Sequence, residues 1–244
     1  MKQVHLVIPC GGAGSRFRDK GILQPKPLIE LFGKPFFYWA TESALASLPV
    51  KDITFIVLEE HITNWKIDEE IKKYYPSANI SVLPYQLNGP VYTALSGVSY
   101  FADGCPIVFQ DCDHAMCAKV EVTDDADGAI LSFNSREPHF GYIKYIGGND
   151  KQYAGTVEKN PVSDHAIFGC YYFKNAEVFT KCVVQYFNDG TSKEFYMSGL
   201  FNYLTNVERV DIAAHYEFGT PDEYETLKEE VQDERKFRML LGIE

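Results

Sequence analysis

The sequence predicts an α/β fold with a Rossmann-like, mixed but mostly parallel central sheet flanked by helices. In the first half of the chain, short apolar runs alternate with stretches whose apolar residues recur at helical spacing, which is typical of β-α-β units. The second half is rich in short strand-like runs. In folds of this class, ligands bind where the parallel strands end.

The first half contains predicted strands that are separated by predicted helices. In the second of these helices, Ile62, Trp65, Ile71 and Tyr74 form an apolar stripe, and the charged residues between them face water. The strands are predicted at residues 3–9, 53–58, 80–84 and 107–110, and the helices at 35–47, 61–75 and 90–101.

The second half adds further strands and a helical C-terminus. The last helix is predicted to begin after Thr220 and Pro221, because threonine caps helix N-termini and proline suits the first helical position. Strands are predicted at residues 128–133, 142–146, 153–158, 168–173 and 207–213, and the other helices at 176–187 and 193–204.

Composition and charge exclude several classes of function. The chain has 244 residues, of which 45% are hydrophobic and 23% are charged, as is ordinary for a globular protein. Its net charge of −11 argues against binding to nucleic acid or to an anionic membrane surface. With no membrane-spanning stretch and no signal peptide before the first strand, we expect a cytoplasmic protein. The sequence leaves open whether it forms a homodimer.

The six cysteines show no spacing typical of a zinc site or of a disulfide framework, and no two of them form a Cys-x-x-Cys pair. They are interpreted mainly as small buried hydrophobic residues. Cys10 and Cys112 lie beside the two loops described next, but no paired histidine is evident, which argues against a nucleophilic role.

A glycine-rich segment directly follows the first predicted strand. Gly11, Gly12 and Gly14 allow the backbone to approach an anion closely, and exposed N–H groups in such a segment form an anion-binding concavity. Arg16 adds a bidentate donor and Lys26 a point charge, which suits a di- or triphosphate. The spacing matches neither the dinucleotide-binding fingerprint nor the P-loop. A flexible turn is the alternative, but the added arginine and lysine favour a phosphate site.

Two aspartates follow the strand predicted at residues 107–110. Asp111 and Asp113 are two positions apart, so on an extended chain both side chains point to the same face. Mg²⁺ is usually held by one or two carboxylates together with substrate phosphates. We therefore predict a metal site with Asp113 as the better ligand and Asp111 as a further candidate; a solvated acidic turn is the alternative. His114 is interpreted as a polar neighbour.

Other segments carry candidate binding residues. Gln86 and Gly89 precede a predicted helix, where an amide can read a base edge, although a plain turn fits equally well. Glu158 can accept hydrogen bonds from sugar hydroxyls and Lys159 can neutralise a phosphate, but Glu-Lys pairs are also common on solvated edges. Glu217 lies just before a glycine turn and is either a second metal ligand or a strand-end acid.

The order of these motifs resembles that of the sugar-phosphate nucleotidylyltransferases. The resemblance rests on the segment from Gly11 to Phe17, on Lys26-Pro27-Leu28 and on Gly33-Lys34-Pro35, and it extends over nearly the whole chain. The chain looks most similar to a short stand-alone branch encoded among bacterial capsule and surface-polysaccharide genes, some of whose members have acceptors other than sugars. It departs from the family pattern at residues 111–114, where the usual Gly-Asp-Asn is replaced, and at Glu217, where many members carry aspartate.

The resemblance implies a role for each candidate residue and for the chain as a whole. Residues 1–244 would form one nucleotidyltransferase domain, with the nucleotide bound by roughly residues 1–115 and the acceptor by residues 116–244. The implied catalytic residues are Arg16 and Lys26; the nucleotide-binding residues are Gly11, Gly12, Gly14, Gln86 and Gly89; the acceptor-binding residues are Gly141, Glu158 and Lys159; and the Mg²⁺ ligands are Asp113 and Glu217.

The implied reaction transfers a nucleoside monophosphate from an NTP to a sugar 1-phosphate or a related phosphomonoester and releases pyrophosphate. The expected partners are therefore an NTP and a phosphorylated small molecule, with Mg²⁺ as cofactor. One alternative is a GT-A-type glycosyltransferase that uses a nucleotide sugar, which would explain Asp111 and Asp113 but not the glycine-arginine-lysine segment. The other is a non-catalytic nucleotide-binding protein, which would not need an acceptor lysine.

Overall fold

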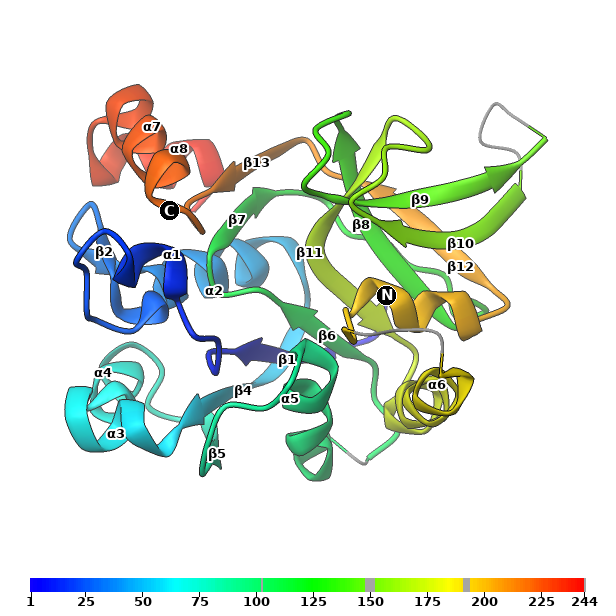
Figure 1. The fold of residues 1–244 in the computed structure, drawn as a ribbon, viewed down its shortest axis with the longest axis horizontal. Coiled ribbons are helices and arrows are strands. Elements are labelled where there is room, and N and C mark those ends of the chain that lie inside the picture. Colours follow the sequence, from blue (N-terminus) through cyan, green and yellow to red (C-terminus); the bar gives the residue numbers. More distant parts are fainter. Residues whose placement is uncertain (102, 148–151, 191–193, 244) are drawn as a thin grey trace.

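The computed structural model describes residues 1–101, 103–147, 152–190 and 194–243. Within these residues, nine strands form one sheet, and its parallel part has the order β6–β1–β4–β5. Strand β1 (Val4–Pro9) lies between β6 (Ile107–Gln110) and β4 (Val50–Leu58), and β5 (Asn79–Leu83) forms the edge (Figure 1). Strands β1 and β6 are buried almost throughout, as expected for parallel strands covered by helices on both faces.

Antiparallel pairs extend the sheet beyond β6. Strand β11 (His165–Phe173) pairs with β6 and with β8 (Gly128–Asn134), and β12 (Val207–Asp211) lies parallel to β8. Strand β9 (Gly141–Ile146) pairs with β11 and with β10 (Gln152–Glu158). The predicted mixed, Rossmann-like central sheet flanked by helices is confirmed, and each of its antiparallel pairs includes at least one strand from the second half of the chain.

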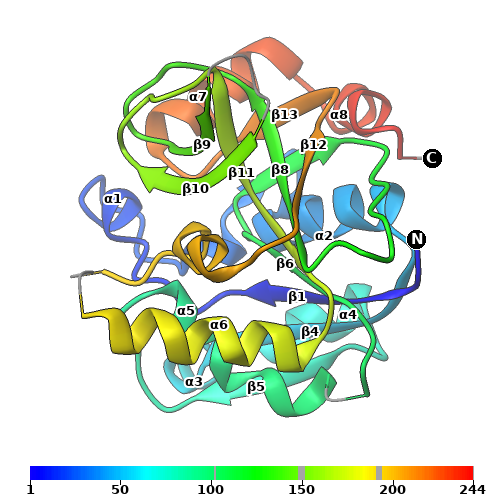
Figure 2. The same ribbon diagram turned by 90° about the vertical axis from the view of Figure 1, so that its right-hand side faces the viewer.

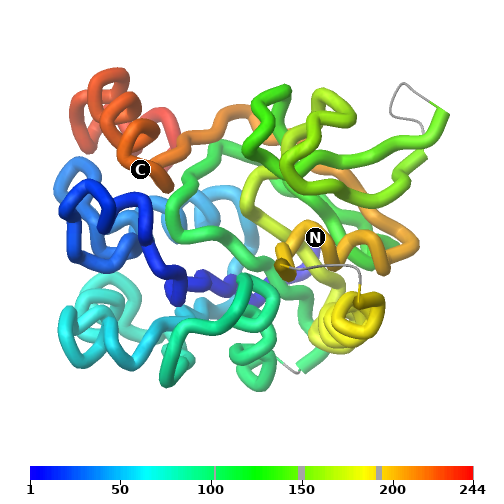
Figure 3. Tube along the Cα trace, viewed as in Figure 1, coloured from blue at the N-terminus to red at the C-terminus, as the bar shows by residue number. Residues whose placement is uncertain are grey.

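One face of the sheet is covered by helices from both ends of the chain. Helices α2 (Phe36–Ser47), α7 (Pro221–Val231) and α8 (Glu234–Leu241) belong to a hydrophobic layer that includes Leu6 and Ile8 of β1. The segment that follows β1, residues 11–18, lies beside the start of α7 (Figure 3). The ring centroids of Phe17 and Tyr224, one from each segment, are 6.2 Å apart.

The opposite face is covered by α5 (Pro90–Ser96) and α6 (Ala176–Asp189), which pack in a second layer with Val7 of β1. Figure 2 shows α2 and α6 on opposite sides of β1. Because successive side chains of a strand point to opposite faces, the apolar residues of β1 serve both layers.

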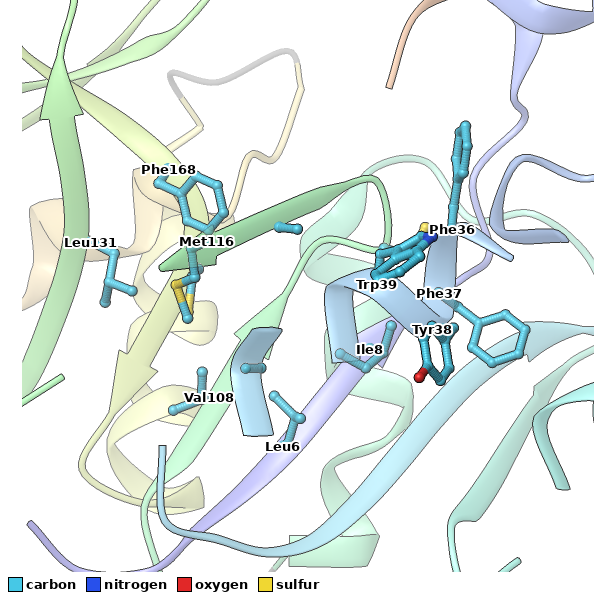
Figure 4. Packing of buried hydrophobic residues seen from close by; sticks show 14 of the residues in the cluster. Leu6, Ile8, Phe36, Phe37, Tyr38, Trp39, Val108, Met116, Leu131 and Phe168 are labelled. Atoms are coloured by element: carbon cyan, nitrogen blue, oxygen red, sulfur yellow. The ribbon is translucent and has the colours of Figure 1, made fainter. Parts of the chain in front are cut away.

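Helix α2 forms the aromatic centre of the first layer. Phe36, Phe37 and Trp39 have no exposed surface, as is typical of a helix that is apolar on several sides. Trp39 donates its indole N–H to the backbone oxygen of Leu31 at 2.7 Å, which satisfies its only polar atom. These side chains belong to the same layer as Ile8 of β1, and Figure 4 shows Trp39 and Phe37 nearer to Ile8 than the ring of Phe36.

The prediction of one continuous helix at residues 61–75 is wrong. It is divided into α3 (Glu59–Trp65) and α4 (Ile67–Tyr74), because Lys66 adopts a left-handed conformation with φ 56°. The turn re-aims the chain so that Ile67 and Ile71 are fully buried in the first layer, whereas Trp65 stays 39% exposed. Tertiary packing therefore overrides a helical pattern that continues locally.

Two other predicted helices are also shorter than expected. The 90–101 segment is α5 followed by a 3₁₀ turn at Val98–Phe101. Of residues 193–204, Lys193 lies outside the described residues, and the helical part is the 3₁₀ helix η3 (Ser198–Tyr203). The C-terminal helix begins at Pro221 with Thr220 as its cap, as predicted; Glu223 completes a capping box, and a break at Gln232 (φ 76°) separates α7 from α8.

Several short elements were not predicted, and they lie near the ends of β1 and β6. Helix α1 (Ser15–Arg18) and the 3₁₀ helix η1 (Lys26–Leu28) follow β1, with a small hairpin of β2 (Glu30–Leu31) and β3 (Lys34–Pro35) after them. Strand β7 (His114–Cys117) pairs with β13 (Ala214–Glu217). In the part of the chain that the structure describes, no helix is both long and apolar enough to cross a lipid bilayer.

We predict that Phe237→Ala lowers the free energy of unfolding by about 3–5 kcal/mol, because Phe237 is fully buried and its deletion leaves a cavity. Its ring lies 4.8 Å from that of Trp39 and 5.3 Å from that of Tyr216 and so joins α8 to two other segments. Urea unfolding followed by circular dichroism measures the change. Met239→Ala on the same helix is the control, because Met239 is 72% exposed; it should change the free energy by less than about 0.5 kcal/mol.

Candidate functional site

A cleft of about 830 Å³ opens at the C-terminal ends of β1 and β6. This is the edge at which parallel α/β sheets bind ligands. The sequence-predicted residues that line the cleft are Gly11, Gly12, Gly14, Arg16, Lys26, Gln86, Gly89, Asp111, Asp113 and Glu217.

The glycine-rich segment bends sharply after β1 and lies over Lys26. Gly14 has φ 61°, which glycine adopts without strain, and it caps α1. A β-carbon at Gly14 would lie 3.4 Å from the Cβ of Lys26, so the loop and the lysine pack closely. Phe17 is buried and anchors α1 to the core, whereas Arg16 remains exposed and lines the cleft.

Lys26 and Asp113 form an ion pair inside the cleft. The Nζ of Lys26 lies 2.5 Å from Oδ2 of Asp113, and both side chains are largely shielded from solvent. Burial would raise the pKa of Asp113, but the charges of Lys26 and His114 and the hydrogen bond from Lys26 together outweigh burial and hold this pKa well below its usual range. Burial likewise would lower the pKa of Lys26, and Asp113 reverses that shift, so the lysine stays charged.

Two glycines make room for the aspartates that follow β6. The backbone N–H of Asp111 donates to the carbonyl of Gly169 at 2.8 Å, and a β-carbon at Gly169 would lie 2.3 Å from Oδ2 of Asp111. Gly169 lies where β11 gains extra residues relative to β8, between Ile167 and Tyr171. On the other side, a β-carbon at Gly219 would lie 2.3 Å from Oδ2 of Asp113.

The pairing of β7 with β13 brings Glu217 to the cleft. In this antiparallel ladder Glu217 lies directly opposite His114, the residue after Asp113. Burial raises the pKa of Glu217 to about 7, with Glu223 and Asp113 adding to the shift and His114 opposing it. Burial and the charge of Asp113 raise the pKa of Asp111 to about 6. The cleft thus holds carboxylates that give up their protons reluctantly, as is common at functional sites.

The side chains of Asp111, Asp113 and His114 each offer a ligand atom within 4.8 Å of the others, so this cluster can hold a metal ion. Nδ1 of His114 is buried and has no hydrogen-bond partner among the described residues. The two carboxylates suit Mg²⁺, which prefers oxygen ligands, whereas imidazole suits transition metals. Burial lowers and Asp113 raises the pKa of His114, with a net rise that favours the protonated, non-ligating ring.

The residues predicted to bind the acceptor are not among those that line the cleft. Gly141 and Glu158 pair across β9 and β10, and the Glu158 carboxylate accepts a hydrogen bond from Ser198. Lys159 has φ 55° and donates from Nζ to the hydroxyl of Tyr196 at 2.9 Å. Tyr196 in turn lines the cleft and donates to Glu194. Lys159 is therefore connected to the cleft through a tyrosine.

Three residues that shape the cleft were not predicted from the sequence, whereas His114 lies beside Asp113 as the polar neighbour that the sequence indicates. The sequence contains an indication of the role of Gly169, because a glycine inside an apolar strand often marks a place where another group approaches the backbone closely. Tyr196 and His139 also line the cleft, but they come from segments without a recognisable pattern.

No family model matches this chain, and no curated protein matches it in sequence. Solved structures match its fold. A nucleoside-diphosphate-sugar pyrophosphorylase from Vibrio cholerae RC9 has a TM-score of 0.76 and 23% identity, with 91% of this chain and 98% of that chain covered. A putative glucose-1-phosphate thymidylyltransferase from Bacillus anthracis has a TM-score of 0.75 and 15% identity, with coverages of 99% and 96%.

The inositol-1-phosphate CTP transferase from T. maritima has a TM-score of 0.74 and 11% identity, with 99% of this chain and 98% of that chain covered. The identities are low, and the three proteins share with this chain an architecture that extends over nearly its full length. The chain therefore has the fold of the sugar-phosphate nucleotidyltransferases.

Proposed function

We propose that this protein is a nucleotidylyltransferase that transfers a nucleoside monophosphate from an NTP to a phosphomonoester and releases pyrophosphate. The observation that carries the proposal is the Lys26–Asp113 ion pair, which joins the glycine-rich segment after β1 to the acidic segment after β6 inside one cleft. The pair holds Lys26, a cation that can bind phosphate, beside the carboxylates of Asp113 and Asp111, which can bind a metal ion. This arrangement suits chemistry between two phosphate groups.

Each group of residues in the cleft has a separate role in this reaction. An oxygen of the acceptor phosphate attacks the α-phosphorus in line, the bond to the bridging oxygen breaks, and pyrophosphate leaves. Arg16 binds the departing β- and γ-phosphates, and Lys26 neutralises charge between nucleotide and acceptor. Backbone N–H groups of Gly11, Gly12 and Gly14 position the triphosphate. Positioning and charge neutralisation account for most of the catalysis, and no protein nucleophile is needed.

The remaining residues bind the base, the metal and the acceptor. Gln86 and Gly89 line the cleft, which supports their proposed role in binding the base. Asp113 and Asp111 would hold Mg²⁺, with Glu217 as a further ligand; when bound, the ion supplies charge neutralisation at the nucleotide phosphates.

The acceptor lies toward Tyr196, through which Lys159, supported by Glu158 and Gly141, acts on its phosphate. The resemblance to a branch encoded with bacterial capsule genes supports a product that is an NDP-activated precursor of a surface polysaccharide. Such a reaction would take place in the cytoplasm.

We predict that a matrix of NTPs and phosphorylated acceptors, assayed for pyrophosphate, contains a pair that the protein turns over. Lys26→Ala should lower this rate by at least about 10²-fold, because it removes a charge that stabilises the transition state. Lys20→Ala, at an exposed lysine of the same segment, is the matched control and should keep the rate. A near-normal rate in Lys26→Ala would rule the proposal out.

Because Lys26→Ala leaves Asp113 buried without its partner, Arg16→Ala provides a second test. Arg16 is exposed, so its removal should leave the unfolding temperature unchanged while it weakens NTP turnover. Consumption of a nucleotide sugar without pyrophosphate formation would instead identify a glycosyltransferase. NTP binding without turnover across the whole matrix would identify a binding protein.

We predict that Gly169→Ala raises the Mg²⁺ concentration needed for half-maximal activity. The new β-carbon would lie 2.3 Å from Oδ2 of Asp111, so this carboxylate must move. Asp111→Asn should have a similar effect, and the double variant should add little to either single change, because both act through one carboxylate. Additive effects in this double-mutant cycle would contradict the role given to Gly169.

We predict that Glu217→Gln stabilises the metal-free protein above pH 7. The pKa of Glu217 is raised from 4.5 to about 7 on folding, so between these values the folded protein holds a proton that the unfolded chain has lost. Stability therefore falls as the pH rises through this window, and the variant should lack this fall. Thermal unfolding in EDTA from pH 4.5 to 8 measures it, with exposed Glu229→Gln as the control. Parallel pH profiles of Glu217→Gln and the wild type would contradict the prediction.

A further inference from the structure

At the end of β1 remote from the cleft, a histidine is buried between two carboxylates. His5 is 2% exposed; its Nδ1 lies 2.7 Å from Oδ1 of Asp52, and its Nε2 lies 2.8 Å from Oδ1 of Asp103. Hydrogen bonds from Lys51 and His5 hold the pKa of Asp103 well below its usual range, so this carboxylate is ionised and only accepts hydrogen bonds. A neutral imidazole has a single N–H. The second contact therefore needs another cation, either a proton or a metal ion.

Cys105 adds a sulfur atom to this histidine. Ligand atoms of His5, Asp103 and Cys105 all lie within 4.8 Å of one another. The backbone N–H of Cys105 donates to Oδ1 of Asp103 at 3.0 Å, which fixes the two residues relative to each other. Nitrogen, oxygen and sulfur in one cluster match the ligand preferences of Zn²⁺, which takes a water molecule as a fourth ligand where protein supplies three. Asp103 is exposed, so the cluster is open to solvent.

The position of Asp52 also matches a metal site. Metal-bound histidines usually donate their other ring N–H to a carboxylate, which orients the ring and fixes its tautomer. Asp52 on β4 is the register partner of His5 on β1, and it binds Nδ1, which leaves Nε2 directed at Asp103 and Cys105. The histidine is thus held by one carboxylate and presented to the other two residues.

A divalent ion would balance the charges of this cluster. The carboxylates of Asp52 and Asp103 and a Cys105 thiolate carry three negative charges, which match the two charges of the ion and the ammonium of Lys51. Nζ of Lys51 lies 4.0 Å from Sγ of Cys105, where it favours the thiolate. Burial and Asp103 nevertheless raise the pKa of this thiol, so the metal-free cysteine keeps its proton.

We propose that His5, Asp103 and Cys105 form a binding site for one divalent ion of the zinc class, which replaces the thiol proton of Cys105. The spacing of the cysteines did not predict this site, because its ligands come from separate segments. The bound ion ties the start of β1 to the loop before β6, and Asp52 extends the connection to β4. The site is independent of the proposed nucleotidyl transfer, because it lies at the opposite ends of these strands.

The test is a titration of the full chain with Co²⁺ and with Zn²⁺, in excess Mg²⁺ to compete at the carboxylates of the cleft. We expect one equivalent of Co²⁺ to produce a thiolate-to-cobalt charge-transfer band. Cys105→Ser should abolish the band, whereas Cys117→Ser, a matched control at another partly exposed cysteine, should keep it. Asp52→Asn should weaken the affinity by about 10–100-fold, as expected for a residue that orients a ligating histidine.

Calorimetry in buffers of different ionisation enthalpy gives a second readout. Zn²⁺ binding should release the thiol proton of Cys105, because a metal ion binds the thiolate and not the thiol. A chain that binds no Zn²⁺ or Co²⁺ would overturn the proposal. A band that survives in Cys105→Ser would overturn it as well, because the metal would then be bound at another cysteine, such as Cys112 beside the cleft.

Discussion

The ion pair between Lys26 and Asp113 is the contact on which the cleft depends. It joins residues that are 87 positions apart in sequence, and each belongs to a loop that follows a central parallel strand. A largely buried ion pair is costly to desolvate, so stability alone is a weak reason to keep it. Its use is more readily understood in a site for polyphosphate, where the lysine and the aspartate have separate partners during the reaction.

The rest of the cleft is built to leave room around this pair. Gly169 and Gly219 stand where any β-carbon would collide with Asp111 or Asp113, and the β7–β13 ladder adds Glu217 from the far end of the chain. The raised pKa values of Asp111 and Glu217 show that these acids are held in surroundings that disfavour their charge. A bound cation would relieve this cost, which is the physical link between the geometry and the proposed metal.

Strand β1 connects two polar clusters. Its side chains from Val4 to Ile8 are almost completely buried and its neighbours on both sides are parallel strands, so it is a rigid element. One end leads into the glycine-rich segment of the cleft, and the other carries His5 with its two carboxylates. The first cluster is proposed to act on nucleotides and the second to stabilise the start of the sheet.

Local patterns in the sequence were enough to predict the sheet flanked by helices and some of the residues that line the cleft, but not Tyr196 or His139. Strand periodicity, the glycine-rich segment after β1 and the paired aspartates after β6 are all short-range features, and parallel strands bring their C-terminal ends together. Tertiary structure alone decided the break at Lys66, the opposition of Glu217 and His114, the fit of Asp111 against Gly169 and the cluster around His5. Each of these depends on contacts between residues far apart in the chain, which no local propensity encodes.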